Sequence, residues 1–246
     1  MSRNGALFAA CLLLCAPLSS ALAQTPPASK PVSEKERSDF RAGLASSAGG
    51  QTFALVIKHY PEEFRAFETE LLSDLLNGRV DMAGVQTRTF NFMMSIRTRM
   101  APNVRRAPTP KLVAFGEAQL SLMKTLLPIA PRVCYEYAEL GGPTPEAAQG
   151  APRTIDPYLN AQNAVQFDVA IAGETSPTPH DSPNGEDFST AFAEFSRRKG
   201  DADWLKAMSI GAPRTQTDSQ RCAAAIVWIE SILSQPPERA ARLLAG

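Results

Sequence analysis

Residues 61–78 read PEEFRAFETELLSDLLNG, with apolar side chains at three- and four-residue intervals. That spacing places side chains on one face of an α-helix. Pro61 suits the first helical position, where a missing N–H costs nothing, and Asn77-Gly78 is a typical helix end. The stretch therefore predicts an amphipathic helix with one buried face, made by Phe64, Phe67, Leu71 and Leu75.

The same spacing recurs along residues 33–246, and no stretch shows the two-residue alternation of a half-buried strand. Ser33 and Glu36 have the spacing of a helix-capping box. Pro102 and the loop to Pro108 are expected to end one helix, and Pro128 and Pro131 to kink or break another, because proline lacks the N–H that a helix interior uses. We predict an all-α fold, an irregular bundle of about seven to nine helices.

Residues 141–153 are rich in Gly and Pro and are expected to form a connector. A boundary near residues 141–155 could divide the chain into two lobes. A single helical domain over residues 33–246 is favoured, because a link between the cysteines at 134 and 222 would cross that boundary. Asp201 is expected to cap a short element that contains Trp204 and Met208.

The first 23 residues have the pattern of an export signal. Arg3 precedes an apolar run of about a dozen residues, and Ala21-Leu22-Ala23 supplies small residues for cleavage after Ala23. The run is short for a membrane-spanning helix. Lipidation at Cys15 is an alternative, disfavoured by Leu14. We expect a periplasmic protein with a flexible lead-in at residues 24–32 and no transmembrane segment after the signal is removed.

Loss of the signal leaves two cysteines, Cys134 and Cys222. An oxidising compartment favours a disulfide between them. Closing a loop of about 90 residues corresponds to on the order of 4 to 5 kcal/mol in the chain-entropy model. The alternative is two separate buried thiols, since cysteine also packs as a small apolar residue.

Composition and motifs exclude several functional classes. The whole chain has 25 basic and 25 acidic residues and 44% apolar residues, which argues against intrinsic disorder and against a general nucleic-acid binder. The sequence contains no Gly-rich phosphate loop, nucleophile elbow, zinc-protease helix or paired-cysteine zinc pattern. We therefore predict no metal and no cofactor.

The uneven distribution of charge is more informative than any single residue. Residues 62–81 carry six acids, whereas residues 86–111 carry six basic residues and no acid. A basic segment of this kind can attract an anionic partner, although the acidic and basic helices could instead neutralise each other. The candidate binding residues are Arg88, Arg97, Arg99, Arg105, Arg106 and Lys111.

Candidate catalytic residues are few. His59 could act as a base near neutral pH, and Glu117 or Glu230 could act as the acid of a helical glycoside hydrolase. For each of them a structural role is the more economical interpretation, because no surrounding motif accompanies it. No catalytic residue is therefore assigned.

We expect an exported helical binding or accessory protein without catalysis of its own, whose partner is an envelope protein or an anionic ligand. One alternative is a cell-envelope hydrolase that uses a Glu or His. Another is an immunity-type protein that inhibits an incoming toxin.

Overall fold

The computed structural model describes residues 31–199 and 216–246. The predicted signal, nearly all of the lead-in and the element expected near Trp204 lie outside these residues.

The described residues contain helices and no strands, so the predicted all-α class is confirmed. Eleven α-helices and one 3-10 turn are present in this part of the chain, more than the seven to nine expected. Their bounds are α1 Glu34–Ser46, α2 Gly50–His59, α3 Pro61–Leu76, α4 Met82–Val104, α5 Thr109–Leu126, α6 Pro131–Leu140, α7 Pro145–Gly150, η1 Arg153–Ile155, α8 Asp156–Thr175, α9 Gly185–Lys199, α11 Asp218–Leu233 and α12 Pro237–Ala245.

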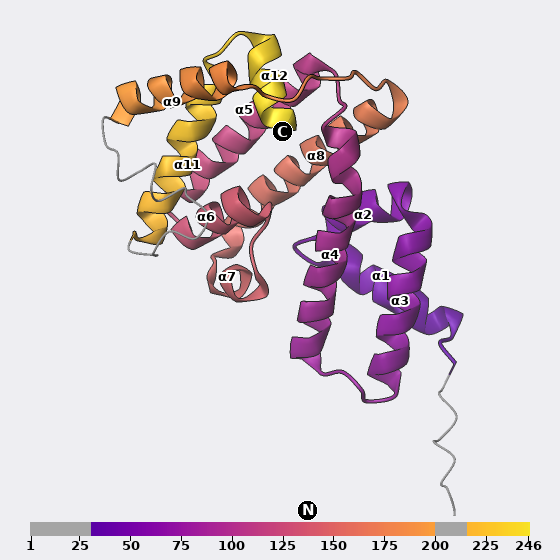
Figure 1. The fold of residues 1–246 in the computed structure, drawn as a ribbon. Coiled ribbons are helices and arrows are strands. Elements are labelled where there is room, and N and C mark those ends of the chain that lie inside the picture. Colours follow the sequence, from indigo (N-terminus) through magenta and orange to yellow (C-terminus); the bar gives the residue numbers. More distant parts are fainter. Residues whose placement is uncertain (1–30, 200–215) are drawn as a thin grey trace, which may run out of the picture.

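Helices α1 to α4 gather at one end of the molecule, and α5, α6, α9, α11 and α12 at the other (Figure 1). The long helix α8 packs against both α4 and α5 and so joins the two ends. One buried apolar cluster includes Val56, Phe64, Ile96, Leu112 and Phe167, from α2, α3, α4, α5 and α8. Phe64 and Leu71 lie on the buried face predicted for residues 61–76.

The second buried cluster joins α5, α6, η1 and α11 through Leu122, Val133, Ile155 and Ile226. Helix α5 contributes to both clusters, because Leu112 belongs to the first. Each cluster also combines residues from before and after the segment 141–155.

Helix α4 ends in the stretch from Pro102 to Pro108, as predicted, although it continues past Pro102 to Val104, because a proline this close to the C-terminus removes a hydrogen bond only from the last turn. One local prediction needs correction. The connector is not all loop. Residues 145–150 form α7, with Thr144 accepting a hydrogen bond from the Ala147 N–H and Pro145 in the first turn.

The buried carboxylate of Glu68 holds α1 against α3. It accepts hydrogen bonds from Arg41 Nε at 2.6 Å and from Arg37 Nη1 at 3.0 Å. Burial acts to raise the pKa of Glu68, but the hydrogen bonds from Arg41 and Arg37 outweigh it and lower this pKa. Each charge in this cluster is therefore compensated.

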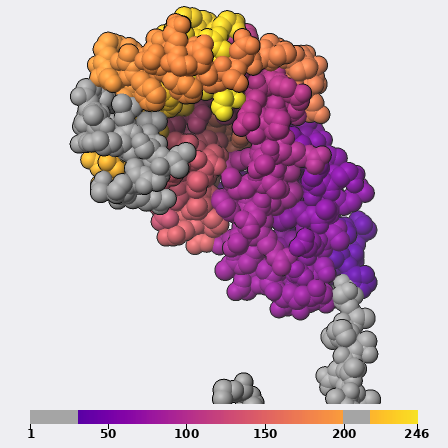
Figure 2. Space-filling model, viewed as in Figure 1, coloured from indigo at the N-terminus to yellow at the C-terminus, as the bar shows by residue number. Residues whose placement is uncertain are grey.

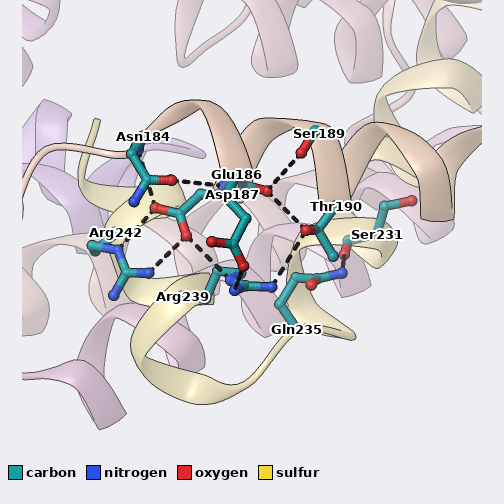
Figure 3. Close-up of polar contacts among 9 residues, drawn as sticks. All are labelled: Asn184, Glu186, Asp187, Ser189, Thr190, Ser231, Gln235, Arg239 and Arg242. Atoms are coloured by element: carbon teal, nitrogen blue, oxygen red, sulfur yellow. Dashed lines mark hydrogen bonds and ion pairs between the residues drawn. The ribbon is translucent and has the colours of Figure 1, made fainter.

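A second buried carboxylate, Asp187, anchors α9 to α12 (Figure 3). It accepts hydrogen bonds from Arg242 Nη2 at 2.6 Å and Nε at 2.9 Å, and Arg239 Nε lies 3.1 Å away. Glu186 pairs with the same Arg239 at 2.7 Å. The hydrogen bond from Arg242 lowers the pKa of Asp187 to about 2, against the opposing effect of desolvation.

Cys134 of α6 and Cys222 of α11 are joined in the structure, with their Cα atoms 5.6 Å apart. Both residues are fully buried. The bond ties α6 to the long helix α11 inside the second cluster, in the pairing predicted from the sequence.

Candidate functional site

A pocket of about 300 Å³ lies between α2, α4, α6 and α8, and the segment 143–156 forms one of its walls. This is the lower end of the volume range for small-molecule sites, which combine apolar walls with a few placed polar groups. The apolar lining includes Phe53, Phe90, Met93, Met94, Ile155 and Leu159.

Arg97 of α4 is the charged group at the centre of this site. Its Nη2 donates a hydrogen bond to Asn163 Oδ1 at 3.1 Å, and its Cζ lies 5.7 Å from the ring centroid of Tyr137. Burial lowers the pKa of Arg97, although a guanidinium stays protonated in proteins. Among the described residues no carboxylate lies within ion-pair distance of it. Asp156, which also lines the pocket, pairs with Arg153 at 3.8 Å.

A chain of neutral hydrogen bonds fixes the acceptor that faces Arg97. Asn163 Nδ2 donates to Thr52 Oγ1 at 3.0 Å, and this hydroxyl donates to Asn160 Oδ1 at 3.0 Å. The Asn160 amide in turn donates to the Ala48 carbonyl at 2.8 Å. Because its nitrogen is used by Thr52, Asn163 presents its oxygen to Arg97.

Tyr137 and Gly142 complete the surroundings of the guanidinium. The Tyr137 hydroxyl donates to Asn163 Oδ1 at 3.5 Å, and burial raises its pKa to about 12, so the phenol stays neutral. A Cβ on Gly142 would lie 1.7 Å from Arg97 Nη1, so the chain approaches the guanidinium more closely than any side chain at this position allows. Arg97 is thus oriented by neutral groups that leave its charge uncompensated.

Helix α7, on the wall of the pocket, is held by α6. Glu136 accepts hydrogen bonds from the Thr144 N–H at 2.7 Å and from its hydroxyl at 2.8 Å. Arg132 donates to the same carboxylate at 3.0 Å. Since α6 also carries Tyr137 and Cys134, one helix links the disulfide, the pocket and its wall.

The other five predicted basic residues do not join Arg97. Arg88 pairs with Asp74 at 2.5 Å and Arg99 with Glu63 at 2.6 Å, both acids of α3, while Lys111 pairs with Asp168 at 2.7 Å. Mutual neutralisation of the acidic and basic helices therefore holds for Arg88 and Arg99. The two remaining residues are exposed arginines after α4, Arg105 and Arg106, of which Arg106 donates to Asn103 at 2.8 Å.

The residues considered for hydrolysis do not line the pocket. His59 lies with its ring centroid 6.2 Å from that of Phe167, and burial lowers its pKa. Glu117 is exposed, and Glu230 pairs with Lys124 at 2.6 Å. No group of three or more His, Cys, Asp and Glu side chains in the described part of the chain is placed to hold a metal ion.

Sequence reasoning included Arg97 but missed its neutral partners. Asn160 and Asn163 are three residues apart on α8, so both amides fall on one face of the helix. That pair is a signal in the sequence, but neither residue carries a charge. Thr52 of α2 and Tyr137 of α6 gave none, because hydroxyl-bearing residues are common in helices without any such role.

No family model, no curated protein and no solved structure matches the chain. Within residues 31–199 and 216–246, no helix has both the length and the apolar character needed to cross a membrane. The function is therefore inferred from the geometry of the pocket.

Proposed function

We propose that the protein binds a small organic anion at Arg97 and serves as an exported binding protein without catalysis of its own. The proposal rests on the Arg97 guanidinium, which lies in a mainly apolar pocket and has no carboxylate partner among the described residues. A buried charge is costly unless it is paired. A bound carboxylate would supply that pairing and could accept two parallel N–H bonds from the guanidinium.

The surroundings of Arg97 favour a monoanion with an apolar body. The neutral amide of Asn163 leaves room for a single negative charge, whereas the lining contributed by Phe53, Met93 and Leu159 suits hydrocarbon. A polyanion would place its further charges against these apolar walls. Export to the periplasm rests on the N-terminal sequence pattern alone.

The test is a ligand panel measured by calorimetry on the native protein: hexanoate, benzoate, hexanol and hexylamine. We expect the two carboxylates to bind one per chain, and the alcohol and amine to bind at least tenfold more weakly. Arg97→Gln should lose carboxylate binding by tenfold or more, since truncating one member of a buried charge pair costs about 2 kcal/mol or more.

Arg99→Gln is the matched control, because Arg99 lies on the same helix but pairs with Glu63 at the surface. It should bind like the native protein. If Arg99→Gln weakens carboxylate binding as much as Arg97→Gln does, the basic segment acts as a diffuse surface and the pocket proposal is wrong. Equal binding of hexanoate and hexanol would also contradict it.

A further inference from the structure

A second hollow continues the Arg97 pocket along α4. It has a volume of about 320 Å³ and lies between α4 and α7, with Val85 and Pro145 in its walls. Phe90, Pro143 and Ala148 line both hollows, so the two share a boundary. In Figure 2 the rose-coloured atoms of the α6–α7 region lie directly beside the magenta atoms of α4.

This second hollow, which we call the α4–α7 groove, contains no acid in its lining. Its one charged residue, Arg153, lines both hollows with a side chain that is 85% exposed and lies beside Asp156. The Gln149 amide donates a hydrogen bond to Gln86 and so bridges α7 and α4 at the groove. The two hollows together thus have the half-buried charge of Arg97 at one end and a mainly apolar path leading away from it.

The distance along this path follows from helix geometry. From Arg97 to Val85 is twelve positions of α4, which at 1.5 Å per residue is about 18 Å. An extended chain of single bonds advances about 1.2 Å per bond, judged from the reach of an extended backbone. Allowing for the space that the Arg97 side chain itself occupies, the path suits a chain of on the order of ten carbons.

We infer that the ligand is a monocarboxylic acid with an unbranched alkyl chain of on the order of ten carbons, whose carboxylate pairs with Arg97 and whose tail lies in the α4–α7 groove. This inference rests on the proposed function, and it adds the class of ligand and the location of its tail. Each methylene removed from water strengthens binding on the order of two- to fourfold. Decanoate has six more methylenes than butanoate and is therefore expected to bind about 60-fold more tightly or better.

The experiment measures dissociation constants of butanoate and decanoate by NMR titration of the full chain, below the aggregation concentration of decanoate. Gln149→Phe fills the groove from an exposed position of the short helix α7 that lines the groove and not the Arg97 pocket. This variant should bind decanoate at least tenfold more weakly than the native protein and butanoate within about twofold of it. The matched control is Ala83→Phe, an exposed position of α4 outside the lining, which should change neither constant.

The possible results distinguish the location of the alkyl tail from the binding of the carboxylate at Arg97. If butanoate and decanoate bind equally, or if Gln149→Phe leaves decanoate binding unchanged, the tail assignment is overturned while the proposed function stands. If neither acid binds the native protein, both are overturned. If Gln149→Phe weakens both acids equally, the groove does not hold the tail, and this inference is wrong.

Discussion

Arg97→Met is expected to stabilise the free protein while abolishing ligand binding. Replacing this half-buried and poorly compensated charge by an apolar residue of similar length gains about 2 kcal/mol, in the lower part of the range seen when buried ion pairs are replaced. The change loses one hydrogen bond, from Arg97 Nη2 to Asn163 Oδ1, which is worth about 1 kcal/mol. The Tyr137 hydroxyl still donates to Asn163 Oδ1. The net expectation is about 1 kcal/mol of added stability.

The assay is urea unfolding at pH 7, followed by far-UV circular dichroism and without ligand. Arg99→Met serves as the surface control, and its free energy of unfolding should stay within about 0.5 kcal/mol of the native value, since exposed pairs contribute little. Glu68→Leu is the opposite case. It leaves Arg37 and Arg41 without their shared buried carboxylate and should destabilise by about 2 kcal/mol.

A loss of stability in Arg97→Met would contradict this prediction. If Arg97→Met unfolds with about 2 kcal/mol less free energy than the native protein, the guanidinium is a structural group like the arginines around Glu68. Arg97 would then stabilise the folded protein and would not serve to bind a ligand.

Two further predictions concern buried polar side chains, and a third concerns the disulfide. The Gln162 side chain is buried and has no hydrogen-bond partner for either amide atom among the described residues, so Gln162→Leu should raise the free energy of unfolding by about 1 kcal/mol in the same urea assay. The lowered pKa of Asp187 contributes stability that is complete above pH 4 and is lost as pH falls from about 4 to about 2. The variant Asp187→Asn should therefore show a shallower acid-unfolding curve over that pH range. An unchanged curve would contradict this role of Asp187. Reduction of the Cys134–Cys222 bond should cost about 4 to 5 kcal/mol in the chain-entropy model and weaken carboxylate binding, because α6 also carries Tyr137. A non-reduced digest should contain the linked peptide, and two alkylatable thiols would refute the bond.

Much of the fold follows from periodic apolar residues and proline positions. Phe64 and Leu71 are buried as their spacing predicts, and α6 begins at Pro131, where the proline pattern places a break. The predicted number of helices is too low partly because α7 has only six residues. It lies within a segment whose Gly and Pro content indicates a loop. A local cap at Thr144 and a long-range contact from Glu136 stabilise it, and composition reports neither of these.

The site could be predicted only in part. Arg97 and Arg99 are two residues apart, which is about 200° around a helix, so they point to opposite faces of α4. Arg97 enters the pocket, whereas Arg99 pairs with Glu63. The number of charges along the chain does not distinguish these two positions. Asn163 was missed because it acts through its neutral amide, whose role depends on Thr52, more than a hundred residues earlier in the chain.

The most direct test of the anion site is a calorimetric titration of hexanoate into the native protein and into Arg97→Met. We expect saturable binding of one hexanoate per native chain and no measurable binding to the variant, provided that circular dichroism finds the variant fully folded. Equal affinity of the two proteins for hexanoate would contradict it, because the carboxylate would then be bound without the guanidinium.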